Sequence, residues 1–163
     1  MSNQITLTAL QDLPLVKYGD DLCSQITDSL ARESLALRDG DIIVVAQKII
    51  SKAEGRTVDL NTVIPGKRAL ELAKETQKDA RVVELILGES KSIIRKKIGV
   101  MIVEHNRGWI MANAGIDASN VGSKGTEENV LLLPRDPEES ATNLRNAMIQ
   151  RHGCDVAVVI SDS

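Results

Sequence analysis

The pattern of apolar and polar positions predicts three strands in the outer parts of the chain. Residues 5–10 alternate apolar and polar side chains, which is typical of a half-buried strand. Residues 42–46 and 156–160 are unbroken apolar runs, rich in β-branched residues and too short for helices. We therefore expect two buried strands there, the first of them central in its sheet. Residues 13–16 are expected to form a loop, because Leu13 precedes a proline.

Four helices are expected where apolar residues recur at helical spacing. Asp20 or Asp21 can cap a helix that runs to about residue 33. Asp136, followed by a proline and two glutamates, begins another helix that ends at Gly153. Two more helices are predicted over residues 67–77 and 80–88. Their expected core contacts are Leu70, Leu72, Ala73, Val83, Leu85 and Leu87.

The middle of the chain also predicts strands joined by short turns. These strands cover residues 92–97, 99–104 and 109–112, and Asn-Arg-Gly at residues 106–108 indicates a hairpin. Helices and strands alternate without a linker, a repeat or a low-complexity tract. We therefore expect one continuous domain over residues 1–163.

Composition favours a soluble globular protein and places few limits on its function. The 163 residues are 42% hydrophobic and 26% charged, which suits one well-buried domain. A net charge of −3 and a pI near 5.4 argue against nucleic acid or an anionic membrane as the main partner. A local basic patch remains an alternative.

Cysteine usage and the N-terminal residues bear on the compartment. Cys23 and Cys154 lie far apart without metal-type spacing, which indicates reduced thiols in a cytosolic protein, with a single disulfide as the alternative. The first ten residues lack the features of a signal peptide, and no apolar run reaches the ~18 residues of a membrane span. We therefore expect a cytoplasmic location.

The most informative stretch is Asn-Ala-Gly-Ile-Asp-Ala-Ser-Asn, residues 113–120. Its small residues let backbone approach a bound group, and Gly115 permits a positive φ angle. Asp117 can hold a divalent metal, and Asn120 can anchor a base, sugar or phosphate. An ordinary turn rich in Asn and Asp, without a ligand, is the alternative.

Two strand ends carry further candidate chemistry. Asp162 follows the apolar run 156–160, where open α/β sheets place ligands and metals, although such an Asp can also be a helix cap. Lys48 and Lys52 follow the run 42–46 and can bind phosphate, although exposed lysines are common. Together with Asp117 and Asp162, the two lysines suit the binding of a nucleoside triphosphate and a divalent ion. The sequence contains no Walker A motif.

The two histidines are isolated in the sequence and are not expected to act as ligands or bases. His105 is expected in a turn, and His152 at the C-terminal end of a helix.

Six motifs in a fixed order resemble the coenzyme F420-0:L-glutamate ligase (F420-0:gamma-glutamyl ligase) family. They are Leu-Pro-Leu-Val at 13–16, Gly-Asp at 40–41, Ile-Ser-Lys-Ala-Glu-Gly-Arg at 50–56, the eight residues 113–120, Leu-Leu-Leu-Pro at 131–134 and Ile-Ser-Asp-Ser at 160–163. The resemblance covers essentially the whole chain. It implies an α+β fold with mixed sheets and packed helices, in a homodimer.

The resemblance also implies an activity and its residues. The enzyme would join L-glutamate to coenzyme F420-0 by γ-linked amide bonds, using GTP and Mg²⁺ or Mn²⁺, through an acyl phosphate. Asp117 and Asp162 would bind one metal and position it for catalysis, and Ser163 would help bind a second. The implied GTP contacts are Leu13, Pro14, Leu15, Val16, Gln47, Lys48, Lys52 and Asn120. At Gln47 and Lys48 the chain departs from the small hydroxyl residues of some members, so position alone supports these two.

The chain is shorter than the family it resembles, and we expect it to lack the C-terminal part. It ends one residue beyond Asp162, as expected of a fragment, with a natural short form as the alternative. Such a chain is expected to have weak or no activity alone, and unpaired strands would favour self-association. Two further alternatives are a non-catalytic nucleotide-binding or dimerisation module and an amide ligase acting on another acid.

Overall fold

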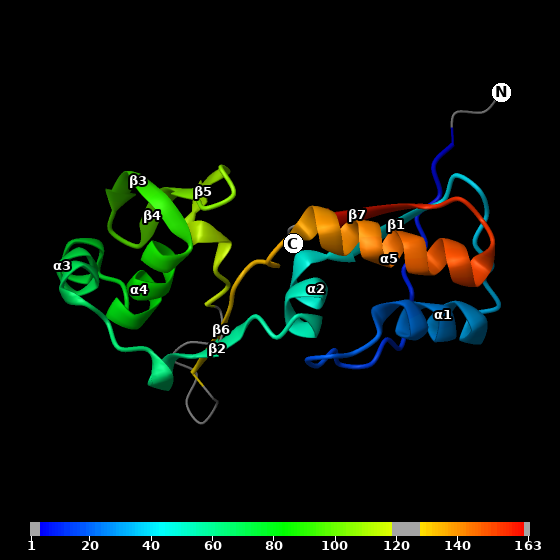
Figure 1. Cartoon of the computed structure of the whole chain (residues 1–163), viewed down its shortest axis with the longest axis horizontal. Coiled ribbons are helices and arrows are strands. Elements are labelled where there is room, and N and C mark those ends of the chain that lie inside the picture. The colour runs from blue at the N-terminus through cyan, green and yellow to red at the C-terminus, as the bar shows by residue number, and fades with distance from the viewer. Residues whose placement is uncertain (1–3, 119–127, 162–163) are drawn as a thin grey trace. The chain divides into compact units, whose positions relative to one another are not determined.

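The computed structural model describes residues 4–118 and 128–161, and the chain, which its sequence predicts as one continuous domain, forms two compact units. Unit 1 comprises Met1–Gly55 with Pro134–Ser163, and unit 2 comprises Arg56–Leu133. Both units combine helices with β-strands, which confirms the predicted α+β class. Figure 1 traces the chain from its blue N-terminal part to its red C-terminal part.

Unit 1 packs helices against a pair of parallel strands. Its elements are α1 (Leu22–Arg32), β1 (Ile42–Ala46), α2 (Gln47–Ala53), α5 (Pro137–His152) and β7 (Ala157–Ser161). Strands β1 and β7 pair in parallel from Ile42↔Ala157 to Ala46↔Ser161. Apolar residues of α1 and α5 pack with the inner side chains of both strands, and Figure 1 shows α5 running along the strand pair.

The predicted helix boundaries of unit 1 are confirmed. The Asp21 carboxylate caps α1 by accepting a hydrogen bond from the Ser24 N–H, at 3.1 Å. Asp136 caps α5 in the same way, and Gly153 ends it at φ +69°. His152 is the last residue of α5, as predicted. Helix α2 was not predicted, because its seven residues are too few to show a clear helical period.

The described residues of unit 2 form two antiparallel sheets, two α-helices and two short 3-10 helices. Its elements are β2 (Thr57–Asp59), η1 (Leu60–Thr62), α3 (Lys67–Thr76), α4 (Ala80–Gly88), β3 (Ser90–Lys97), β4 (Val100–His105), β5 (Ile110–Ala112), η2 (Asn113–Gly115) and β6 (Asn129–Leu131). Strand β2 pairs with β6, and the other sheet has the order β3-β4-β5. The predicted helices, strands and hairpin of this unit are confirmed.

Side chains from most elements of unit 2 form one core. Leu60, Val83, Ile86, Met101 and Val103 are fully buried there. Of the predicted core contacts, Leu72 and Ala73 of α3 and Val83 of α4 are buried, and Leu85 and Leu87 are partly buried. Leu70 was wrongly predicted, because it is 46% exposed on the outer side of α3.

Three other predictions are wrong. Residues 5–10 form no strand, because no described strand pairs with them and Ile5 and Leu7 are almost fully exposed. Strands β1 and β7 are not fully buried, and each buries only one face. His105 is the buried last residue of β4 instead of a turn residue.

Two further observations concern the cysteines and membrane spans. Cys23 is buried, Cys154 is partly buried, and both are free thiols. Burial raises the pKa of the Cys23 thiol above its usual value. Across residues 4–118 and 128–161, every helix is too short or too polar to span a lipid bilayer.

Candidate functional site

The stretch that begins at Asn113 has an unusual backbone. The φ angles of Asn113, Ala114 and Gly115 are +50°, +54° and +69°, so three successive residues lie in the left-handed region. For a residue with a side chain, this conformation costs about 1–2 kcal/mol. Such outliers persist where the surrounding structure fixes them, and they cluster at functional sites.

Buried contacts within unit 2 hold this backbone in place. The Asn113 Oδ1 atom accepts a hydrogen bond from the Met101 N–H at 3.1 Å, and the Asn113 carbonyl accepts one from Ile116 at 3.1 Å. Ala114 is almost completely buried. A Cβ atom at Gly115 would lie 2.6 Å from Leu133 Cδ1, so only glycine fits there without a shift. The positive φ angle that Gly115 was predicted to permit is confirmed.

Asp117 lies at the end of this strained turn and is anchored by its backbone. It forms an isolated antiparallel bridge with Leu131, with both N–H···O=C hydrogen bonds at 2.9 Å. Asp117 itself is half-buried. Asn120, which was predicted as a nucleotide contact, lies outside the described residues.

The carboxyl ends of β1 and β7 form the second candidate region, in unit 1. Ala46 pairs with Ser161, so the last described residue of β7 lies beside the residue that precedes α2. Lys48 and Lys52 lie one helical turn apart on α2. Asp162 and Ser163, predicted as metal ligands, follow β7 in the sequence but lie outside the described residues.

Gln47, the first residue of α2, is buried. Its Oε1 atom accepts a hydrogen bond from the buried Ser51 hydroxyl at 3.1 Å. A nucleotide contact through this oxygen would compete with Ser51. The predicted nucleotide contact of Gln47 therefore gains no support from the geometry.

Unit 1 also contains residues 13–16, which precede α1 as a loop, as predicted. Leu15 is 85% exposed, and only Val16 of the four is half-buried. The chain that follows is held at the C-terminal end of α2, because the Gly19 N–H donates to the Ala53 carbonyl at 2.9 Å. Residues 13–16 and the two lysines of α2 thus belong to one unit. The hydrogen bond between Gly19 and Ala53 holds the segment that follows residues 13–16 at the end of α2.

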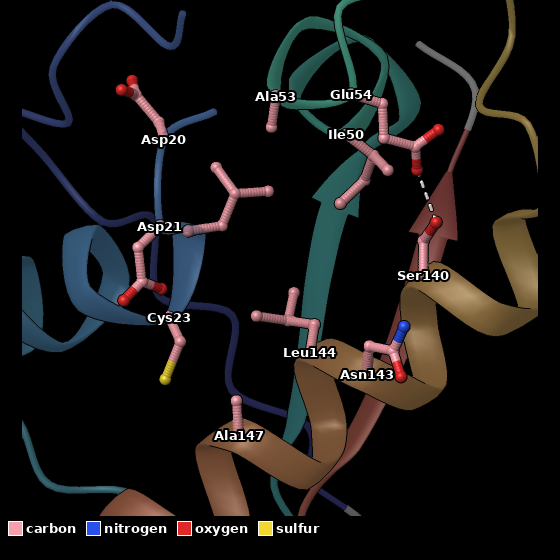
Figure 2. Close-up of a pocket in the computed structure, with 11 residues that line it drawn as sticks. Asp20, Asp21, Cys23, Ile50, Ala53, Glu54, Ser140, Asn143, Leu144 and Ala147 are labelled. Atoms are coloured by element: carbon pink, nitrogen blue, oxygen red, sulfur yellow. Dashed lines mark hydrogen bonds between the residues drawn. The ribbon is translucent and has the colours of Figure 1, made fainter. Parts of the chain in front are cut away.

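A cavity of about 300 Å³ lies between the N-terminal end of α1, the C-terminal end of α2 and the side of α5 (Figure 2). Its lining residues are Asp20, Asp21, Leu22, Cys23, Ile50, Ala53, Glu54, Ser140, Asn143, Leu144 and Ala147. The Glu54 carboxylate accepts hydrogen bonds from the Ser140 hydroxyl at 2.5 Å and from the Arg135 N–H at 2.9 Å. Asp20 accepts from the Lys17 N–H at 2.8 Å, and Asp21 caps α1. These carboxylates thus hold local backbone and helix ends in place.

No sequence pattern indicates this cavity, because its lining comes from three helices that are distant in the sequence. None of the predicted site residues that the structure describes lines it.

In unit 2, Arg56 connects two of the motifs found in the sequence. Its Nε atom donates to the Leu133 carbonyl at 2.8 Å, and its Nη2 atom donates to Glu89 Oε2 at 2.9 Å. The Arg56 carbonyl accepts from Leu132 at 3.1 Å. Arg56 therefore holds residues 131–133 in place. In this segment, Leu131 pairs with Asp117 and Leu133 packs against Gly115.

His105 lies beside the same Glu89 carboxylate. Its Nε2 atom is 3.5 Å from Glu89 Oε2, its Nδ1 atom accepts from the Arg107 N–H at 3.1 Å, and its ring stacks on Trp109. Burial lowers the pKa of His105 below its usual value, and the Glu89 charge opposes this effect. The sequence signals neither this burial nor this partner.

Within the part of the chain that the structure describes, no group of three or more His, Cys, Asp or Glu side chains could hold a metal. Asp117 is the one predicted metal ligand inside that part, because Asp162 and Ser163 lie outside it.

Comparison with known proteins gives a consistent result. Residues 11–163 match the family described as F420-0:Gamma-glutamyl ligase. Relatives named Coenzyme F420:L-glutamate ligase include one from Methanothermobacter thermautotrophicus, 42% identical over 98% of this chain and 62% of the relative. Those from Methanocaldococcus jannaschii and Archaeoglobus fulgidus are 39% and 38% identical, over 93% and 98% of this chain. The match covers 57% and 60% of these two relatives.

The chain thus spans about three fifths of the length of the curated relatives it matches. The expectation that the C-terminal part is the missing one is not borne out by these matches, which cover 93–98% of this chain and 57–62% of the relatives.

Proposed function

Because the chain belongs to the F420-0:gamma-glutamyl ligase family, we propose that it contributes to a ligase that adds L-glutamate to coenzyme F420-0. The observation that carries this proposal is the match over residues 11–163, together with 42% identity to a relative named Coenzyme F420:L-glutamate ligase. The new bond would be an amide between the F420-0 carboxylate and the glutamate nitrogen, and γ-glutamyl amide bonds would join any further glutamates. The alternative is an amide ligase that acts on another acid.

We propose GTP as the energy source, bound by residues 13–16, Lys48, Lys52, Asn120 and, with least support, Gln47. The lysine side chains suit this role, because an ammonium group offsets charge on phosphate oxygens. Lys48 and Lys52 lie on one helix that follows directly from a strand end, which supports a shared phosphate contact.

We propose that Asp117 and Asp162 hold Mg²⁺ or Mn²⁺, and that Ser163 helps to bind a second ion. Carboxylate and hydroxyl oxygens are the ligands that these hard cations prefer. The anchored backbone of Asp117 and of the turn before it supports the assignment, since a rigid turn keeps a ligand oriented without further ordering cost. A bound cation would supply positive charge next to the phosphates.

The chemistry requires an activated carboxylate. An oxygen of the F420-0 carboxylate would attack the γ-phosphorus of GTP, and the bond to the β-phosphate oxygen would break, releasing GDP. The glutamate nitrogen would then attack the acyl carbon, lose a proton and displace phosphate. The lysines would reduce the repulsion between the carboxylate and the triphosphate.

The first test is GTP binding by calorimetric titration with and without Mg²⁺. We expect Asp117→Asn to weaken binding in Mg²⁺ at least about tenfold. The fold should be unchanged, because the Asp117 backbone still pairs with Leu131. Asp59→Asn is the matched control, since it removes one charge from the same unit but keeps the oxygen that accepts from Asn61. Equal affinities for the two variants would contradict the role of Asp117.

A second test measures glutamate ligation with F420-0, L-glutamate, GTP and Mg²⁺, followed by mass spectrometry. A product carrying added glutamate supports the proposal. GTP binding without product would favour a non-catalytic nucleotide-binding or dimerisation module, which the limited coverage of the relatives also suits. Absence of GTP binding would overturn both functions.

We also propose a homodimer in the cytoplasm, where GTP is available. Sedimentation equilibrium tests the dimer, and a monomer at all concentrations would contradict it.

A further inference from the structure

The β1–β7 sheet of unit 1 has one covered face and one open face. Ile43, Val45, Val158 and Ile160 belong to the core formed with α1 and α5. Alternate residues along a strand point to opposite faces, so their neighbours face away from this core. In the strand register, Ile42 pairs with Ala157 and Val44 with Val159, which forms a continuous apolar patch. We call Ile42, Val44, Ala157 and Val159 the open face.

The open face is strongly exposed. Ile42 and Val44 are each 62% exposed and Val159 is 45% exposed, whereas Val45 on the covered face is 7% exposed. Parallel sheets almost always have both faces covered, and a sheet of two strands is rarely stable by itself. The sequence of these strands therefore fits a sheet that is buried on both sides.

The edges of the same sheet also lack protection. Neither β1 nor β7 contains a charged residue, and among the described residues neither strand has another partner. Natural edge strands usually carry charges or prolines that prevent further pairing. Strand β3 of unit 2 follows this rule, because its exposed end carries Arg95, Lys96 and Lys97. The composition of β1 and β7 is that of internal strands.

We propose that the open face and a free edge of the β1–β7 sheet bind the polypeptide that the family relatives contain beyond the matched region. About two fifths of each relative lies outside the match, which is enough for a layer of helices and added strands. The open face consists of apolar side chains, so it requires an apolar partner. Each relative contains additional polypeptide outside the region that matches this chain.

The test is co-expression of the tagged chain with a second polypeptide, the part of the Methanothermobacter thermautotrophicus ligase that lies outside the match. We expect the two to co-purify. Val44→Lys and Val159→Lys should each reduce the captured amount at least about tenfold, because a lysine would be buried without a partner. Ile94→Lys is the matched control, since Ile94 is 54% exposed on β3 of unit 2. It should leave capture unchanged.

Circular dichroism checks that each variant is folded, and Val44→Thr replaces any lysine variant that is not. Failure of the wild-type chain to capture the polypeptide would overturn the proposal. Equal capture by Val44→Lys and Ile94→Lys would also overturn it. Light scattering of the chain alone tests a second copy as the occupant. A dimer that Val44→Lys converts to monomer would assign the open face to self-association and overturn the proposal.

Discussion

The two units use similar apolar strands with different results. In unit 2, Met101 and Val103 of β4 are fully buried, because the sheet and helices of one continuous segment close a core. In unit 1, Val45 is buried but Val44 is 62% exposed, because two distant segments supply one parallel pair. Short hairpins let antiparallel strands find partners locally, whereas parallel strands depend on distant chain. A run of valine and isoleucine therefore predicts a strand, but not how many of its faces are covered.

The largest expected effect tests the closed core of unit 2. Leu72→Ala should destabilise the unit by about 3 kcal/mol, because it leaves a cavity in a packed core. Leu70→Ala on the same helix is the control and should cost less than about 1 kcal/mol, because Leu70 is 46% exposed. Urea unfolding followed by fluorescence of Trp109, the single tryptophan, measures both. Equal costs would show that the core of unit 2 is not closed as described.

The next effect concerns the strained turn before Asp117. Gly115→Ala should cost about 2–3 kcal/mol, from the positive φ angle together with the clash with Leu133. Gly108→Ala shares the positive φ angle but places its Cβ in open space, so it should cost about 1 kcal/mol. The same urea experiment applies. A Gly108 variant as unstable as the Gly115 variant would remove the argument for close packing at the turn.

A pair of neighbouring residues tests the two faces of the unit 1 sheet. Val45→Ala should destabilise unit 1 by about 1.5 kcal/mol, because two buried methyl groups are lost. Val44→Ala should change stability by less than about 0.5 kcal/mol in the chain alone. Hydrogen exchange of the α1 and α5 amides, measured by mass spectrometry, follows this unit without a tryptophan. An equal increase in exchange for both variants would contradict the exposure of Val44 on the open face.

The smallest effect is the pH dependence from His105. Burial lowers its folded-state pKa below the ordinary 6.5, so the unfolded chain takes up the proton first as the pH falls. The stability of unit 2 is therefore full above about pH 6.5 and declines as the pH falls through the lower folded value. His105→Gln should flatten this decline between about pH 7.5 and about pH 5.5 in urea unfolding followed by Trp109. An unchanged slope would assign the dependence to other groups.

Much of the secondary structure followed from local sequence. Asp21, Asp136 and Gly153 mark helix ends through side-chain and backbone geometry that acts within a few residues. The strand predicted over residues 5–10 failed because alternation alone does not supply a pairing partner. His105 was misplaced for a related reason, since its burial depends on Glu89 and Trp109 from other segments.

The candidate site was only partly accessible from sequence. Gly115 was expected to permit a positive φ angle, which it has, and the structure adds a separate constraint, the close contact with Leu133. The link from Arg56 to the Leu133 carbonyl joins two motifs that are separate in the sequence. The roles of Asp117, Asp162 and Ser163 in metal binding stay predictions.

The sequence alone determined the helix ends, the hairpin, the α+β class and the family resemblance, because each depends on nearby residues or on ordered motifs. The tertiary structure decided which apolar residues are buried, how the chain divides into two units and how Asp117 is anchored. The physical reason is that burial and strand pairing depend on contacts between segments far apart in the chain, which no local pattern encodes.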